Sequence, residues 1–172
     1  MKKISFILII AIATLSGNAQ SNVKRTDSAV YSKTNYLITK SDAEKILGQP
    51  ANLINNSVEQ KRIVTIYKCT YRILSDPDTN TTSNLYYLFE EYTNIASAKK
   101  IYTDIVAGNT TSGIKEINSI GDEGFLHTDG KNFDLIIVRK QNKIIRIKIN
   151  KITKTTSREQ LQDVTRRISL EL

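Results

Sequence analysis

The sequence contains one cysteine, Cys69, and one histidine, His127. A single cysteine cannot form an intramolecular disulfide, so the fold must be stable without one. A zinc ion needs several nitrogen or sulfur ligands, and these two side chains are too few to supply them. We therefore expect no zinc site and no other cofactor.

Long hydrophobic runs are also scarce, because the only one covers residues 4–15. It is shorter than the roughly twenty residues of a membrane-spanning helix. Two lysines precede it and small residues follow it up to Ala19, which is the pattern of a secretory signal. We expect a signal peptide over residues 1–19, a flexible polar lead-in over residues 20–35, and a periplasmic or secreted protein without a transmembrane anchor.

The remaining residues, 36–172, have the length of one domain. Hydrophobic periodicity and turn residues predict its elements in this order: a helix that ends at Gly48, strands 63–74 and 85–92, a helix from Asn94 to Gly108, strands 114–120, 125–128, 133–139 and 144–150, and a helix that starts at Thr156 or Ser157. Hairpin spacing favours an antiparallel sheet over repeated βαβ units. The prediction is an α+β domain, with a mainly antiparallel sheet of about six strands and three helices in an α/β/α sandwich.

The stretch SIGDEGFLHTDG, residues 119–130, is the first place to search for a catalytic site, because it combines acidic residues with the only histidine. Asp122, Glu123 and His127 define one hypothesis, a small envelope hydrolase. Calcium is conceivable there too, but the ligand ladder of a calcium loop is absent. The other interpretation is structural: the acids lie in a strand connection, and His127 lies near the end of a strand before an Asp-Gly turn.

Positive charge is concentrated near the end of the chain. Ten basic residues lie between positions 139 and 167, against two acidic ones, and such asymmetry indicates an anionic partner. The candidate ligand-binding residues lie on the last strand and the last helix: Arg146, Lys148, Arg158, Arg166 and Arg167. Two explanations remain open, a true binding surface or a solvated face whose lysines protect a sheet edge.

Two other features belong to strands. Cys69 is in phase with the apolar positions of its strand, which predicts a buried structural thiol. In the segment NLYYLFEEY, residues 84–92, the aromatic side chains cannot all lie on the inner face. This segment is therefore a second candidate surface, for a protein or a glycan.

Four further segments are SDAEKILGQP, IGDEGF, LIIVRKQNKIIRIKI and the closing amphipathic helix. Together they resemble small secreted bacterial domains of the PsbP-like α/β/α sandwich type, including lipoprotein and sensor-like domains of unknown function. The resemblance implies this fold, export, and binding as the commoner use. This chain departs from it at Asn18, where a lipidated cysteine would stand, and in having only Cys69, which cannot form the disulfide of some such domains.

These observations favour an exported, noncatalytic binding domain over the hydrolase. Its partner is expected to be an anionic envelope component or a protein. Nucleic acid is not expected as a partner, because an exported protein is separated from intracellular nucleic acid. The basic segment also lacks the interleaved aromatic residues that would favour nucleic-acid binding.

Overall fold

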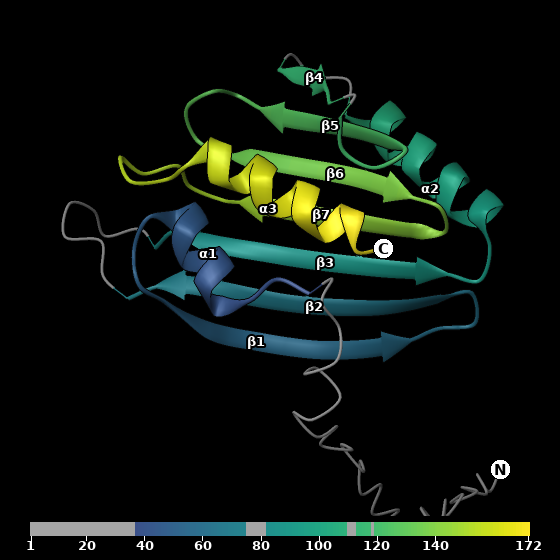
Figure 1. Cartoon of the computed structure of the whole chain (residues 1–172), viewed down its shortest axis with the longest axis horizontal. Helices are drawn as coiled ribbons and strands as arrows, with labels where there is room; N and C mark the ends of the chain where they lie inside the picture. Colours follow the sequence, from purple (N-terminus) through teal and green to yellow (C-terminus); the bar gives the residue numbers. More distant parts are fainter. Residues whose placement is uncertain (1–36, 75–81, 110–112, 118) are drawn as a thin grey trace, which may run out of the picture.

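The structure is a computed structural model that describes residues 37–74, 82–109, 113–117 and 119–172. The predicted signal peptide and lead-in, residues 1–35, lie outside the described residues. Among the described residues, no helix is long and apolar enough to cross a membrane. The described part is an α+β domain in which helices cover both faces of an antiparallel sheet (Figure 1).

Three helices and seven strands form the domain. The helices are α1 (Lys40–Leu47), α2 (Ile95–Gly108) and α3 (Arg158–Leu170). The strands are β1 (Ala51–Gln60), β2 (Val64–Ile73), β3 (Asn84–Tyr92), β4 (Ile114–Glu116), β5 (Glu123–Thr128), β6 (Asp134–Lys140) and β7 (Lys143–Ile149). All neighbouring strands are antiparallel, in the order β1-β2-β3-β7-β6-β5-β4. The predicted class and the order of the predicted elements are confirmed.

Strand β1 is an additional strand that the sequence analysis did not place. Its first residue, Ala51, is buried, but every residue from Asn52 to Gln60 is exposed. Because β1 is an edge strand with almost no buried side chains, its sequence shows no alternation of apolar and polar residues. Hydrogen bonding to β2 defines this strand, and hydrophobic patterning does not.

The helices begin where short polar side chains can cap them. Thr39 and Asp42 form a reciprocal capping box at α1, and Gly48 ends that helix with a left-handed backbone (φ 67°). Asn94 accepts a hydrogen bond at the start of α2, and Ser157 does so at the start of α3. All three predicted helices are therefore confirmed.

The sheet separates two hydrophobic cores. Helices α1 and α3 cover one face, which we call the α3 side, and α2 covers part of the other face, the α2 side. Alternation in β7 shows the division clearly, because Ile145, Ile147 and Ile149 belong to the core on the α3 side and Ile144 belongs to the other. The predicted sandwich with helices on both faces is thus observed.

The strand before the glycine-rich stretch is shorter than predicted, because β4 covers only Ile114–Glu116 of the expected strand 114–120. The chain then turns at Gly121 (φ 72°), where a side-chain carbon would lie 2.6 Å from the carbonyl oxygen of Arg139. The following loop is organised by Asp129, whose carboxylate accepts hydrogen bonds from the backbone N–H groups of residues 131–133. These bonds hold the pKa of Asp129 well below its usual range.

Candidate functional site

Two of the three basic residues of β7 lie on the α2 side of the sheet. Arg146 and Lys148 alternate with the buried isoleucines of the other core, so their side chains point away from α3. Two basic residues of β2, Lys68 and Arg72, lie on the same face because they alternate with Cys69 and Tyr71. We call Lys68, Arg72, Arg146 and Lys148 the basic face.

Strand pairing connects the basic face across three strands. Thr70 of β2 is opposite Tyr86 of β3, and Tyr86 is opposite Lys148 of β7. Tyr86 is 40% exposed, although its neighbour Tyr87 is buried on the α3 side. The prediction that the aromatic residues of this segment divide between the two faces is confirmed.

Arg146 forms a partly buried ion pair within the domain. Its Nη2 donates to Oε2 of Glu90 at 2.6 Å, and the Glu90 side chain is only 9% exposed. A buried carboxylate is costly unless a cation neutralises it, so Arg146 stabilises the domain at this position. Its Nε is buried without a hydrogen-bond partner. The charge of Arg146 is therefore largely neutralised by Glu90 within the domain.

Arg72 and Lys148 are differently placed, because neither forms an ion pair with a carboxylate of the described residues. The Nε of Arg72 donates to the neutral side chain of Asn84 at 3.0 Å. The Nζ of Lys148 lies 5.8 Å from the ring centroid of Phe133, in a cation–π contact. Both side chains are exposed, so their charges are available to solvent.

The three arginines of α3 do not join the basic face, since α3 covers the opposite side of the sheet. Arg158 bonds both carboxylate oxygens of the buried Asp134. Arg167 donates to Asp42 of α1 at 2.7 Å, and Arg166 pairs with a carboxylate on its own helix. The expectation that these arginines could converge with Arg146 and Lys148 is therefore wrong.

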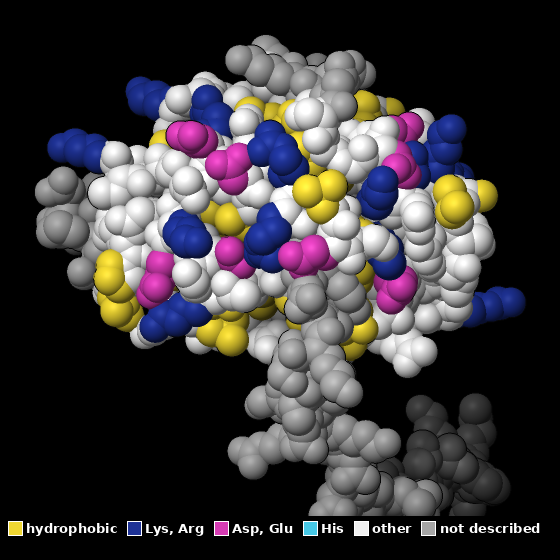
Figure 2. Space-filling view, in the orientation of Figure 1, with side chains coloured by type: hydrophobic (Ala, Val, Ile, Leu, Met, Phe, Trp, Pro, Cys, Tyr) yellow, Lys and Arg dark blue, Asp and Glu magenta, His cyan; other side chains and the backbone are white. Residues whose placement is uncertain are grey.

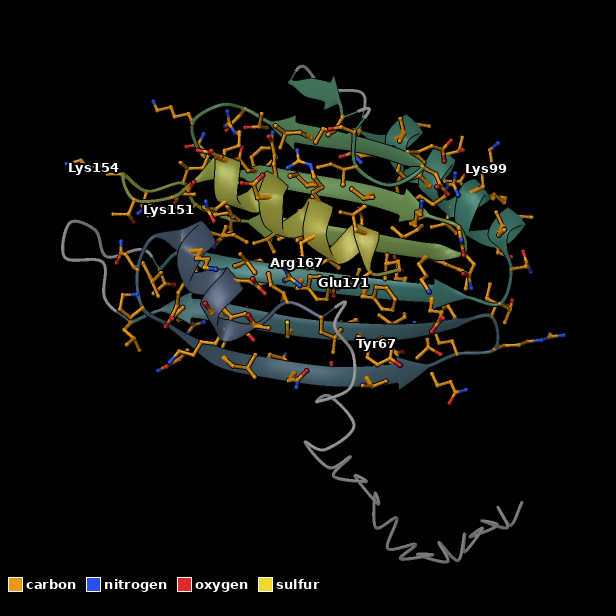
Figure 3. All side chains as sticks on the ribbon, in the orientation of Figure 1. Tyr67, Lys99, Lys151, Lys154, Arg167 and Glu171 are labelled. Atoms are coloured by element: carbon orange, nitrogen blue, oxygen red, sulfur yellow. The ribbon has the colours of Figure 1, made fainter. Side chains whose placement is uncertain are left out.

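Charges of both signs are interleaved on the α3 side, as the space-filling view of that face shows (Figure 2). Figure 3 shows Arg167 beside Glu171 in the last turns of α3, where their side chains form a second ion pair at 3.4 Å. Interleaved charges cancel at short range, so the described residues of this face form no unbalanced positive patch. Arg158 and Arg167 instead connect α3 to other elements of the domain.

The acidic residues of the hydrolase hypothesis are engaged in structural contacts. Asp122 and Glu123 both bond the guanidinium of Arg139, a side chain that is only 9% exposed. The backbone N–H of Gln141 also donates to Asp122 at 2.7 Å and is the main cause of the lowered pKa of that carboxyl. Both acids reach one cation because Asp122 precedes β5, where side chains do not alternate between the faces as they do within a strand.

His127 lies further along β5, four residues from Glu123, which is about 13 Å of extended chain. Its ring packs edge-on against Phe133 at 5.1 Å, and its Nδ1 is 3.0 Å from the side-chain oxygen of Asn109. The expected half-exposed position in a strand is observed. No group of three or more histidine, cysteine, aspartate or glutamate side chains in the described ranges could hold a metal ion.

No known protein family, curated protein or solved structure matches this chain. The candidate site is therefore defined by geometry alone. The sequence analysis missed Lys68 and Arg72, and it placed Tyr86 on a separate candidate surface, although alternation in their strands already set each of them apart from the buried residues. Their proximity to Lys148 required knowledge that β3 pairs with β7.

Proposed function

We propose that this chain is an exported, noncatalytic binding domain whose basic face takes an anionic ligand, such as an envelope polymer or an acidic protein. The observation that carries the proposal is the pair Arg72 and Lys148, two exposed cations on one sheet face without a carboxylate partner among the described residues. Exposed charges attract an anion over about 8 Å at physiological ionic strength. Tyr86 lies between their strands and offers ring surface for contact.

The noncatalytic assignment rests on how the acidic residues are used. Asp122 and Glu123 are bonded to Arg139, and His127 lies too far along β5 to share a proton with them directly. A general acid or base must reach the reacting group within hydrogen-bond distance. The geometry thus favours binding over the hydrolase hypothesis.

The test compares two double variants with the same loss of charge. Replacing Arg72 and Lys148 by glutamine removes the two available cations and leaves the buried pair of Arg146 intact. The control replaces Lys45 of α1 and Arg62 of the β1–β2 turn, which are exposed and lie away from the basic face. With heparin as the probe, the R72Q/K148Q variant should elute at distinctly lower salt, and the K45Q/R62Q variant should stay close to the wild type.

Equal shifts for the two variants would show that only net charge matters, and the proposal would then be wrong. Arg146 is left unchanged in this test, because its removal leaves Glu90 buried without a counter-charge. Unfolding of an R146Q variant would then be mistaken for lost binding.

Export rests on the signal pattern of residues 1–19. It is checked by N-terminal sequencing of protein recovered outside the cytoplasm, which should begin near Gln20. An intact Met1 on that material contradicts it. The resemblance to PsbP-like domains stays a prediction.

A further inference from the structure

A cavity of about 240 Å³ opens on the α3 side of the sheet, beside α1. Its walls come from the segment that leads into α1 and from the neighbouring strands β1, β2 and β3. Figure 3 shows Tyr67 on the viewer's side of β2, at a place where neither α1 nor α3 crosses the sheet. The cavity and the basic face therefore lie on opposite sides of the sheet.

Aromatic and aliphatic side chains line most of this cavity, including Tyr67, Tyr71, Tyr87, Leu53 and Ile38. The rings have defined positions. Tyr67 packs against Phe89 with ring centroids 5.6 Å apart, and the hydroxyl of Tyr71 donates to the carbonyl of Ile38 at 3.4 Å. A preformed wall of rings binds an apolar molecule with little cost in ordering.

The described lining of the cavity presents no charge to a ligand. Among the described residues that line it, the only charged one is Lys68, whose side chain is directed to the other face and whose Nζ lies 3.3 Å from a carboxylate oxygen of Glu59. Burial raises the pKa of the Cys69 thiol to about 12, so this group is uncharged at neutral pH. A charged ligand would lose its hydration here without gaining a counter-charge.

We propose that this cavity binds a small uncharged molecule that contains a ring and one hydrogen-bonding group. A cavity of about 150 Å³ accepts benzene, so this one has room for a substituted ring or two fused rings. The polar group on the ligand would meet Asn56 of β1, an exposed amide that lies opposite Cys69 in the strand register and lines the same cavity.

The first test uses 2-naphthol as the neutral probe and 2-naphthoate as the anion of similar shape, with calorimetry on the mature chain. We expect 2-naphthol to bind with little dependence on salt, and the anion to bind at least about tenfold more weakly. Saturation with 2-naphthol should also slow the alkylation of Cys69 by N-ethylmaleimide, because this thiol lines the cavity. Equal binding of both probes overturns the proposal.

Variants locate the binding to the cavity. Leu53→Trp narrows the opening and should weaken 2-naphthol binding by about tenfold or more, whereas the control Leu170→Trp, at an 80% exposed position on α3, should not. Asn56→Ala removes only an exposed amide and should therefore fold even if Leu53→Trp does not. We expect it to weaken 2-naphthol binding severalfold.

Two further results contradict the proposal. One is the absence of measurable binding at a probe concentration of about 1 mM. The other is binding that appears only after removal of residues 20–36, or only in a dilute monomer, which would mean that the chain itself or a second copy fills the cavity. Neither result affects the heparin test, since the basic face lies on the other side of the sheet.

Discussion

Removal of the Arg158 guanidinium should strongly destabilise the domain. The carboxylate of Asp134 is almost fully buried, with 2% of its side chain exposed, and Arg158 donates to it at 2.8, 3.1 and 3.2 Å. A further bond, from Nη2 to the hydroxyl of Thr128, adds to these contacts. The Arg158→Gln variant would leave a buried charge without a counter-charge, and the first turn of α3 without its bond to β6.

The magnitude follows from this geometry. Loss of one partner from a buried ion pair costs about 3 to 5 kcal/mol. Arg158 itself is 41% exposed, so water can partly replace it, and we expect a loss of about 3 kcal/mol in the free energy of unfolding. In a domain of this size the melting temperature should then fall by about 10 °C.

Urea unfolding followed by circular dichroism measures this loss directly. The matched control is Arg166→Gln, because Arg166 pairs with the exposed Asp163 on the same helix, and its removal should cost less than about 0.5 kcal/mol. In the double variant Asp134→Asn with Arg158→Gln, the buried charge is absent and much of the loss should be recovered. If Arg158→Gln costs no more than Arg166→Gln, Asp134 does not depend on Arg158 and the reasoning is wrong.

Three other substitutions test the turns and the acid behaviour. Gly121→Ala should cost about 2 kcal/mol or more in urea unfolding, because the added carbon meets the Arg139 carbonyl at a left-handed backbone position. In Gly108→Ala the added carbon would meet no neighbouring element within 4 Å, so this change should stabilise α2 by about 0.5 kcal/mol, and a loss of stability contradicts the assigned helix end. Asp122→Asn should lower the free energy of unfolding at neutral pH, because the lowered pKa of Asp122 means that its ionised form stabilises the fold. The difference between variant and wild type should shrink as the pH falls below about 4. A constant difference down to pH 2 contradicts the assigned role of the Gln141 hydrogen bond.

Local signals in the sequence predicted the elements well where the chemistry is local. The capping box of Thr39 and Asp42 is contained in four residues, and the isoleucine alternation of β7 follows from a two-residue period. Strand β1 escaped prediction for the opposite reason. Since almost none of its side chains is buried, its pairing with β2 left no hydrophobic pattern to detect.

The candidate site was predictable only in part, because it depends on contacts between distant residues. Arg146 pairs with Glu90 across 56 positions, and Arg158 pairs with Asp134 across 24. Alternation placed Arg146 and Lys148 on one face of a strand, but it could not determine on which side α3 packs. Charge composition alone therefore combined residues that the sheet separates.

The position of β7 has a consequence for how the chain folds. The strand order places β7 between β3 and β6, so the two halves of the sheet are joined by residues far apart in sequence, such as Leu85 and Ile149. Until residues 143–149 have been synthesised, β3 has a free edge next to Phe89, and β6 has one beside Val138. Pairing of such distant segments is slow, and free apolar edges favour aggregation. In a nascent chain that ends before position 143, β1–β3 and β4–β6 therefore lack the strand that joins them. Strand β7, near the end of the sequence, connects them into a single sheet.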